Sequence, residues 1–281
     1  MYQNPMTSEP VRIKSKDHIE NMVYKFRTWN DIEHYRYHKK LLIDREMYFS
    51  SPQSFNDPFD CCVVTDYSML QKNPELQQTH FRSIIVRTFP NITEQQINEK
   101  VEQLIKDSRF NDPQWILLAN QKQRESFYKS YGVFSFSKTK SNILLWSHYA
   151  DSHQGFCLGF DLRLIKNHLE NKVGGCDVFY SVDYPKIPPI NSTDNQFMQQ
   201  ISTKSIDWKY EEEFRLFIVG AEQSIEVPKQ CFKEITLGCK MENKYKKEII
   251  DFIKKEIPEM RVIQAIQSDD KFQLTFENIN L

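Results

Sequence analysis

Three consecutive glutamates at the start of an apolar strand pattern, in Trp208–Val219, constrain this chain more than any other feature. Side chains on a strand point alternately to opposite faces, which puts Glu211, Glu213 and Arg215 together on one face. Like charges on one face repel unless a cation, a ligand or water takes up the charge. The motif therefore predicts a site, and the alternative is a solvated edge strand in which Arg215 pairs with the carboxylates. The opposite face would carry Tyr210, Phe214, Leu216 and Ile218, with Glu212 among them.

The composition is that of a globular protein with balanced charge. The 281 residues are 40% hydrophobic, which is enough for a sizeable core in one large domain or two small ones. The 37 basic and 38 acidic residues give a net charge of −1. This balance argues against a general polyanion binder and leaves a local basic patch open. With 7 glycines, the chain contains no glycine-rich phosphate loop.

The cysteines and the hydropathy pattern predict a cytoplasmic protein. None of the six cysteines forms a C-x-x-C pair, so most of them are expected to be reduced, buried apolar side chains. The first twenty residues have no apolar run suited to a signal peptide. No stretch reaches the roughly 18 apolar residues of a membrane span, so no membrane association is expected.

Strand and helix patterns follow one another without a regular βαβ rhythm, which predicts an α+β fold. We expect a flexible N-terminal lead-in over residues 1–22 and a single α+β domain over 23–281, with a helical insert at about 66–130. Thr93 and Gln96 fit a capping box at the start of one helix of the insert. Strands are expected at 23–27, 47–51, 133–137, 155–161, 178–182, 214–219, 235–238 and 272–276, and helices at 31–44, 93–105, 114–129, 143–150, 163–171 and 244–257.

Polar residues gather where the first two predicted strands end. Arg27 closes the first strand, and its fork of donors suits a phosphate or a carboxylate. Ser50 and Ser51 end the second, where small hydroxyls allow a ligand to approach closely. Asn56 and Asp57 follow in a segment whose turn chemistry explains them without a function.

A further polar block, Trp146–Gly155, contains two histidines. His148 and His153 are five residues apart and do not share a helix face, so no metal site is expected from them. Ser147 precedes His148, but no G-x-S-x-G elbow accompanies the pair. His148 is therefore expected to be a hydrogen-bonding residue of a site wall or of the core.

Three long blocks carry a family resemblance. Tyr48–Asp60, Trp146–Asp161 and Lys204–Arg215 resemble the bacterial domain-of-unknown-function family 2971. This resemblance would span about residues 24–238, and the family name implies no activity.

A more remote resemblance does imply one. The order Arg27, then Ser50 or Ser51, then Glu211 and Glu213 is similar to the arginine–serine–glutamate class of the ADP-ribosyltransferase superfamily. It implies strands around a cleft with helical insertions, and NAD as the substrate. The strict Ser-Thr-Ser triplet of that class is replaced by two serines and a proline.

The second resemblance also implies roles for single residues. Arg27 would contact the phosphate or ribose of NAD, and Ser50 or Ser51 would orient the nicotinamide end. Glu213 would hold a ribose hydroxyl and stabilise the cation formed as nicotinamide leaves, while Glu211 would activate an acceptor nucleophile. Phe55 or Phe59 would stack on the nicotinamide, and the remaining candidate NAD contacts are Asn56, Asp57, His148, Tyr149 and Arg215.

The function implied is an NAD-dependent ADP-ribosyltransferase or NAD glycohydrolase. By analogy it would act in a toxin or anti-phage system, on a macromolecular acceptor and with a partner protein of that system. One alternative is a ligand-binding or sensor module with a degenerate cleft. Another is a metal-dependent nuclease that uses Asp57, Asp60, Glu211, Glu213 and His148. The transferase hypothesis requires that Arg27, one of the two serines and Glu213 meet in one cleft.

Overall fold

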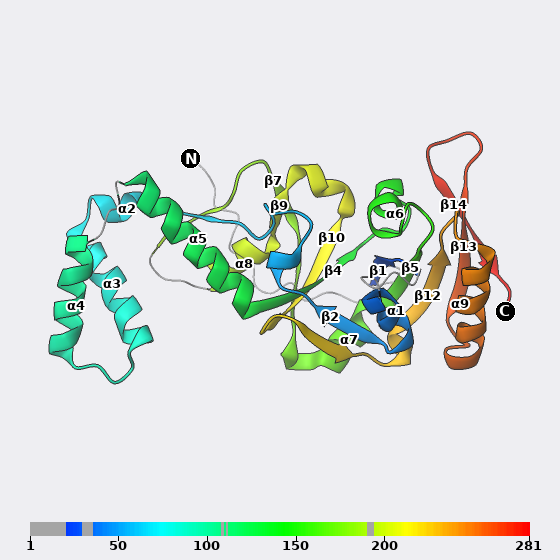
Figure 1. Cartoon of the computed structure of the whole chain (residues 1–281), viewed down its shortest axis with the longest axis horizontal. Coiled ribbons are helices and arrows are strands. Elements are labelled where there is room, and N and C mark those ends of the chain that lie inside the picture. Colours follow the sequence, from blue (N-terminus) through cyan, green and yellow to red (C-terminus); the bar gives the residue numbers. More distant parts are fainter. Residues whose placement is uncertain (1–20, 30–35, 108–109, 111, 190–193) are drawn as a thin grey trace.

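The computed structural model of the chain describes residues 21–29, 36–107, 110, 112–189 and 194–281 (Figure 1). The predicted flexible lead-in lies outside the described residues except for its last two, and Met22 already begins the first strand. Within the described residues, none of the helices is both long and apolar enough to cross a membrane.

One large mixed sheet forms the body of the protein and confirms the α+β fold. Its neighbouring strands run antiparallel except β12 and β13, which are parallel. In spatial order the strands are β14 (Leu274–Ile279), β13 (Arg261–Gln267), β12 (Phe232–Leu237), β5 (Phe156–Asp161), β1 (Met22–Arg27), β4 (Tyr131–Ser137), β10 (Glu213–Val219) and β6 (Gly174–Asp177).

Helices cover both faces of this sheet. Apolar side chains of α1 (Arg36–Ile43), α7 (Leu162–Leu169) and α9 (Asn243–Glu256) share the main core with phenylalanines of β4 and β5. On the opposite face, Leu145 and Trp146 of α6 (Ile143–Tyr149) pack with Phe26 and Cys157 in a smaller core.

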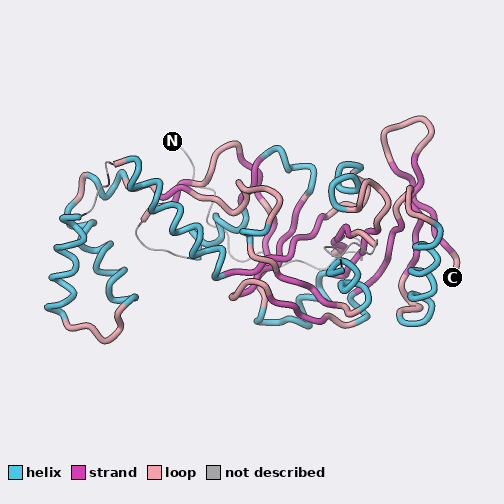
Figure 2. Tube along the Cα trace, in the orientation of Figure 1, coloured by secondary structure: helices cyan, strands magenta, loops and turns pink. Residues whose placement is uncertain are grey.

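The helical insert projects away from the sheet and has an apolar cluster of its own (Figures 1 and 2). It consists of α2 (Ser68–Gln71), α3 (Pro74–Thr88), α4 (Glu94–Asp107) and α5 (Pro113–Ser130). The predicted capping box is confirmed: Thr93 N donates to Gln96 Oε1 at 3.1 Å, and Gln96 N donates to Thr93 Oγ1 at 3.4 Å. The sequence predicted α4 and α5 but not α2 or α3.

Three short two-stranded sheets and several helical turns complete the described fold. β2 (Glu46–Phe49) pairs with β11 (Gln223–Glu226), β3 (Val64–Thr65) with β8 (Lys186–Ile187), and β7 (Phe179–Ser181) with β9 (Thr203–Ser205). The remaining elements are α8 (Asp194–Ser202) and the 3-10 helices η2 (Pro52–Ser54), η3 (Glu170–Lys172), η4 (Ile206–Glu211) and η5 (Lys229–Cys231).

The sheet opens into a fork between its two central strands. β1 and β4 pair only at Tyr24 and Ser137, although each strand pairs along its length with its other neighbour. Further along β4, Val133 exchanges both backbone hydrogen bonds with Ser50, just beyond β2. A continued ladder would place Phe26 opposite Ser135. Instead the two strands part and leave room between them.

The predicted strand over Trp208–Val219 is wrong in its first half. Residues 206–211 form η4, Glu212 has a left-handed backbone with φ 45°, and β10 begins only at Glu213. Tyr210 therefore does not share a face with Phe214: it packs beside the smaller core, and Phe214 packs in the main one. The solvated-edge alternative is also wrong, because β10 lies between β4 and β6 and its glutamate is buried.

Candidate functional site

A pocket of about 530 Å³ lies at the fork between β1 and β4. This volume is within the usual range for small-molecule sites. Residues of α1, β2, α6 and β9 complete its walls. Seven of the residues predicted from the sequence line it: Arg27, Ser50, Phe55, Asn56, Tyr149, Glu211 and Glu213.

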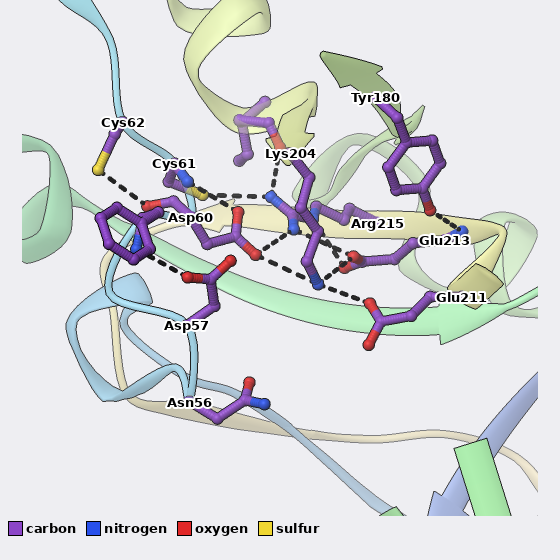
Figure 3. A network of polar contacts seen from close by, with 12 residues as sticks. Asn56, Asp57, Asp60, Cys61, Cys62, Tyr180, Lys204, Glu211, Glu213 and Arg215 are labelled. Carbon is purple, nitrogen blue, oxygen red and sulfur yellow. Dashed lines mark hydrogen bonds and ion pairs between the residues drawn. The ribbon is translucent and has the colours of Figure 1, made fainter. Parts of the chain in front are cut away.

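Lys204 lines this pocket, and its ammonium group lies among three carboxylates, those of Asp60, Glu211 and Glu213 (Figure 3). Its Nζ donates to Glu211 Oε2 at 2.6 Å and to Glu213 Oε2 at 3.0 Å, and it lies 3.4 Å from Asp60 Oδ2. Lys204 comes from β9 and is only 7% exposed. One buried cation thus holds three carboxylates from different segments together.

Arg215 lies behind this wall and is completely buried. Its guanidinium donates to both oxygens of Glu213 at 2.8 and 3.1 Å and to Asp60 Oδ2 at 2.7 Å. It also donates to Cys61 Sγ and to the carbonyl of Ile201. The fork of donors is fully used within the protein, so Arg215 positions the carboxylates and does not line the pocket.

The left-handed residue Glu212 explains how both glutamates reach Lys204. It lets the chain turn from η4 into β10, at a cost of about 1 kcal/mol or more for a non-glycine residue. Glu213 N donates to Tyr180 Oη at 2.8 Å, which fixes the start of β10. Glu211 and Glu213 therefore face the same amine, as predicted, but through a turn and not through strand alternation.

The surroundings push the pKa values of the two glutamates in opposite directions. Burial raises the pKa of Glu211, and the charge of Glu213 raises it further, despite the nearby Lys204. Burial alone would raise the pKa of Glu213 too, but Arg215 and Lys204 hold it well below its ordinary value of 4.5. Burial likewise opposes the charge of Lys204, but Glu213, Asp60 and Glu211 raise the pKa of its ammonium. Two carboxylates with separated pKa values suit an acid–base role for Glu211 and a permanent charge on Glu213.

Tyr149 completes the surroundings of Glu211. Its hydroxyl donates to Glu211 Oε1 at 2.6 Å, while Asn56 Nδ2 donates to the same hydroxyl at 3.3 Å. Burial and the charge of Glu211 raise the pKa of Tyr149, so it stays a donor. Each oxygen of Glu211 thus has one donor and keeps capacity for another.

The lowered pKa of Glu213 predicts acid sensitivity that depends on this residue. A carboxylate whose pKa falls on folding adds stability above its ordinary pKa, and this contribution is lost as the pH falls below about 4.5. Wild type should therefore be more stable than Glu213→Gln at pH 7, and the difference should shrink at pH 3. Urea unfolding of both proteins at the two pH values measures it. Glu211 is present in both proteins, so its own titration affects both. If the stability difference between wild type and Glu213→Gln were the same at pH 3 as at pH 7, the lowered pKa of Glu213 would be contradicted.

Besides Arg215, four predicted site residues do not line the pocket. Ser51 is buried and caps η2, accepting from Gln53 N and donating to the Tyr128 carbonyl. His148 is exposed and is hydrogen-bonded to Tyr210 Oη at 2.9 Å, so it does not line the pocket. Asp57 and Phe59 line a second pocket of about 500 Å³ on the other side of Lys204.

Local turn chemistry explains Asp57, as the sequence suggested. Its Oδ1 accepts from Phe59 N at 2.9 Å, which forms an Asx turn. With Phe59 63% exposed in the second pocket, Phe55 is the phenylalanine placed to contact a ligand in the first. Its ring also packs on the guanidinium of Arg215, 5.8 Å from its centroid.

Sequence reasoning missed two lysines that line the pocket, and the aspartate that Lys204 shares with Arg215. Lys204 begins one of the three blocks that carry the family resemblance, but the sequence predicted no role for it. Asp60 was predicted only in the nuclease alternative, and Lys25, two residues before Arg27, had no predicted role. A lysine near a cluster of acidic residues was the available signal. It could not be used because the six residues between Lys204 and Glu211 gave no indication of a turn.

The geometry does not support the metal-dependent nuclease. Lys204 occupies the position between Asp60, Glu211 and Glu213 that a divalent ion would need. Asp57 and His148 lie elsewhere, as described above. Among the described residues, no group of three or more histidine, cysteine or acidic side chains is placed to hold a metal ion.

Comparison with known proteins assigns no activity. Residues 145–216 match the model of a family described as a protein of unknown function, DUF2971. This range contains the blocks at Trp146–Asp161 and Lys204–Arg215, whereas the block at Tyr48–Asp60 lies outside it. No curated protein and no solved structure matches the chain significantly.

Proposed function

We propose that the pocket binds NAD and cleaves its nicotinamide–ribose bond, as an ADP-ribosyltransferase or NAD glycohydrolase does. The observation that supports this proposal is that Arg27, Ser50, Glu211 and Glu213 line one pocket. These residues come from separate parts of the chain, and the transferase hypothesis required them to meet.

The distribution of charge in the pocket suits this reaction. Arg27 supplies a cation for the phosphates, on the β1 wall. The opposite wall carries Asp60, Glu211 and Glu213 against Lys204 and Arg215, which leaves one negative charge in excess. Positive charge develops on the ribose as nicotinamide leaves, and a preorganised carboxylate wall stabilises it.

The proposed step balances without a redox partner. The bond between ribose C1′ and the nicotinamide nitrogen breaks, and its electron pair neutralises the nicotinamidium. A hydroxyl of the acceptor, or of water, forms the new bond to C1′ and loses its proton to Glu211, which later releases it to solvent. Glu211 is the better base of the pair, because its pKa is raised and it has hydrogen-bonding capacity left.

Nicotinamide release from NAD by the pure protein tests the proposal. We expect release by wild type and a loss of about 100-fold or more in Glu211→Gln, as for removal of a general base. The matched control is Glu212→Gln, which alters the exposed neighbour outside the pocket and should leave the rate unchanged. NAD should raise the melting temperature of wild type and of both variants.

A specific observation favours a second candidate, a binding module without turnover. Both oxygens of Glu213 are already engaged by Arg215 and Lys204, so a ribose hydroxyl must compete with them. This module would show the thermal shift with NAD but no nicotinamide release in any variant. Neither release nor a shift would contradict both candidates.

A further inference from the structure

Two cations on the β1 wall of the pocket have no acidic partner among the described residues. Lys25 Nζ donates to the Ser135 carbonyl at 2.5 Å, and Arg27 Nη1 donates to the Phe26 carbonyl at 3.1 Å. Both acceptors lie on the strands that part at the fork. Both charged ends are thus hydrogen-bonded to carbonyls of the parted strands, and no described acidic side chain forms an ion pair with either.

The cations of the opposite wall, in contrast, are paired with carboxylates. Lys204 contacts three carboxylates and Arg215 contacts two, whereas Lys25 and Arg27 have none within ion-pair distance in the described structure. Both side chains are half-buried, and even partial burial of a charge without a counter-charge costs free energy. An anionic ligand in the pocket would offset that cost.

The two side chains are arranged to act together. Lys25 and Arg27 are two residues apart on one strand, so both project from the same face. Lys25 Nζ lies 4.8 Å and the Arg27 guanidinium carbon 5.9 Å from the centroid of the Phe134 ring. A shared aromatic support keeps both charged ends at one place in the pocket.

We propose that Lys25 and Arg27 together bind a diphosphate group at the fork between β1 and β4. A single carboxylate would neutralise one of the two charges, whereas a diphosphate diester carries two negative charges and neutralises both. The inference deepens the proposed function by naming the part of the substrate that is recognised and a residue, Lys25, that recognises it. It rests on that function only for the identity of the rest of the ligand.

The electrostatics of Lys25 supply a distinctive readout. Burial, and then the charge of Arg27, lower the pKa of Lys25 well below its ordinary value, while Glu213 and Glu211 oppose this and Lys204 adds to it. A bound diphosphate would raise that pKa again, so the affinity for the ligand should fall as the pH rises through the pKa of Lys25 in the free protein. The other ionisable residues lining the pocket are Tyr24, Glu46, Tyr48, Asp60 and Tyr149.

Calorimetric titration with ADP-ribose tests the site, because its phosphate diesters do not titrate near neutral pH. Titration over a range of pH should show that the affinity of wild type falls as the pH rises. Lys25→Gln should bind about 10-fold or more weakly, as expected for loss of a charged hydrogen bond, and its affinity should depend less on pH. Lys247→Gln, an exposed lysine of α9, is the control and should behave as wild type.

Two further ligands separate this inference from the proposed function. Inorganic pyrophosphate should bind and compete with ADP-ribose, and adenosine should not compete. Pyrophosphate binding without nicotinamide release would uphold the diphosphate site and remove the catalytic proposal. Equal affinity of wild type and Lys25→Gln for both phosphate ligands would overturn the inference, whatever the fate of NAD.

Discussion

Arg215→Ala is expected to lower the free energy of unfolding by about 3–5 kcal/mol, the usual cost of removing one partner from a buried ion pair. The substitution leaves Asp60 and Glu213, which are 2% and 4% exposed, without the guanidinium that holds them. It also leaves a cavity in the place of the fully buried Arg215 side chain. Urea unfolding at pH 7 measures the loss.

Arg163→Ala is the matched control. Arg163 also pairs with an aspartate, Asp161, but its side chain is 45% exposed and solvent can replace it. Asp161 keeps its role as the cap of α7, because it accepts from Arg163 N through the backbone. Stability should therefore change far less. Equal losses in the two variants would show that the buried network does not hold the fold together.

Lys204→Ala is expected to change what the pocket binds. Without the ammonium, Asp60, Glu211 and Glu213 face one another with only Arg215 to balance them. Loss of the ammonium should raise the pKa of Glu211 further above its ordinary value, so the variant should gain stability relative to wild type as the pH falls. Carboxylate oxygens are also the ligands that Ca²⁺ and Mg²⁺ prefer, and the vacated position lies between them.

Thermal unfolding with and without a divalent cation tests this expectation. Millimolar Ca²⁺ or Mn²⁺ should stabilise Lys204→Ala by several degrees and leave wild type unchanged. Lys140→Ala is the control, because Lys140 pairs with the buried Glu234, which keeps Arg261 as a second partner. A response of wild type to the metal would instead revive the nuclease alternative. No response of Lys204→Ala would show that the three carboxylates do not remain in place.

Helices and strands could be predicted from the sequence where they bury apolar side chains in the core. The alternation in β4, the apolar run in β5 and the helical spacing in α9 predicted these elements, because each packs apolar side chains on the main core. The residues after Trp208 misled the same reasoning. Their alternation of polar and apolar side chains fits a strand, but Ser205 caps a 3-10 helix there and Glu212 turns left-handed.

Some of the candidate site residues could be predicted from the sequence. Arg27, Ser50, Glu211 and Glu213 were singled out by their chemistry and order, and the structure brings all four to one pocket. Ser51 and His148 were chosen on the same grounds but are held by local hydrogen bonds elsewhere. A sequence motif names residue types, and only the packing of their neighbours decides which side chain faces the cavity.

The sequence by itself determined the α+β class, most of the large strands and the choice of Glu211 and Glu213 as site candidates. These features follow from local periodicity and residue chemistry, which act over a few residues. Only the tertiary structure decided that β1 and β4 part to form a pocket, and that Lys204 joins Asp60 to both glutamates. Such contacts link Asp60 to residues some 150 positions later. Their energy comes from burial and charge pairing in three dimensions, and a local sequence pattern contains no information about which distant residues will pair.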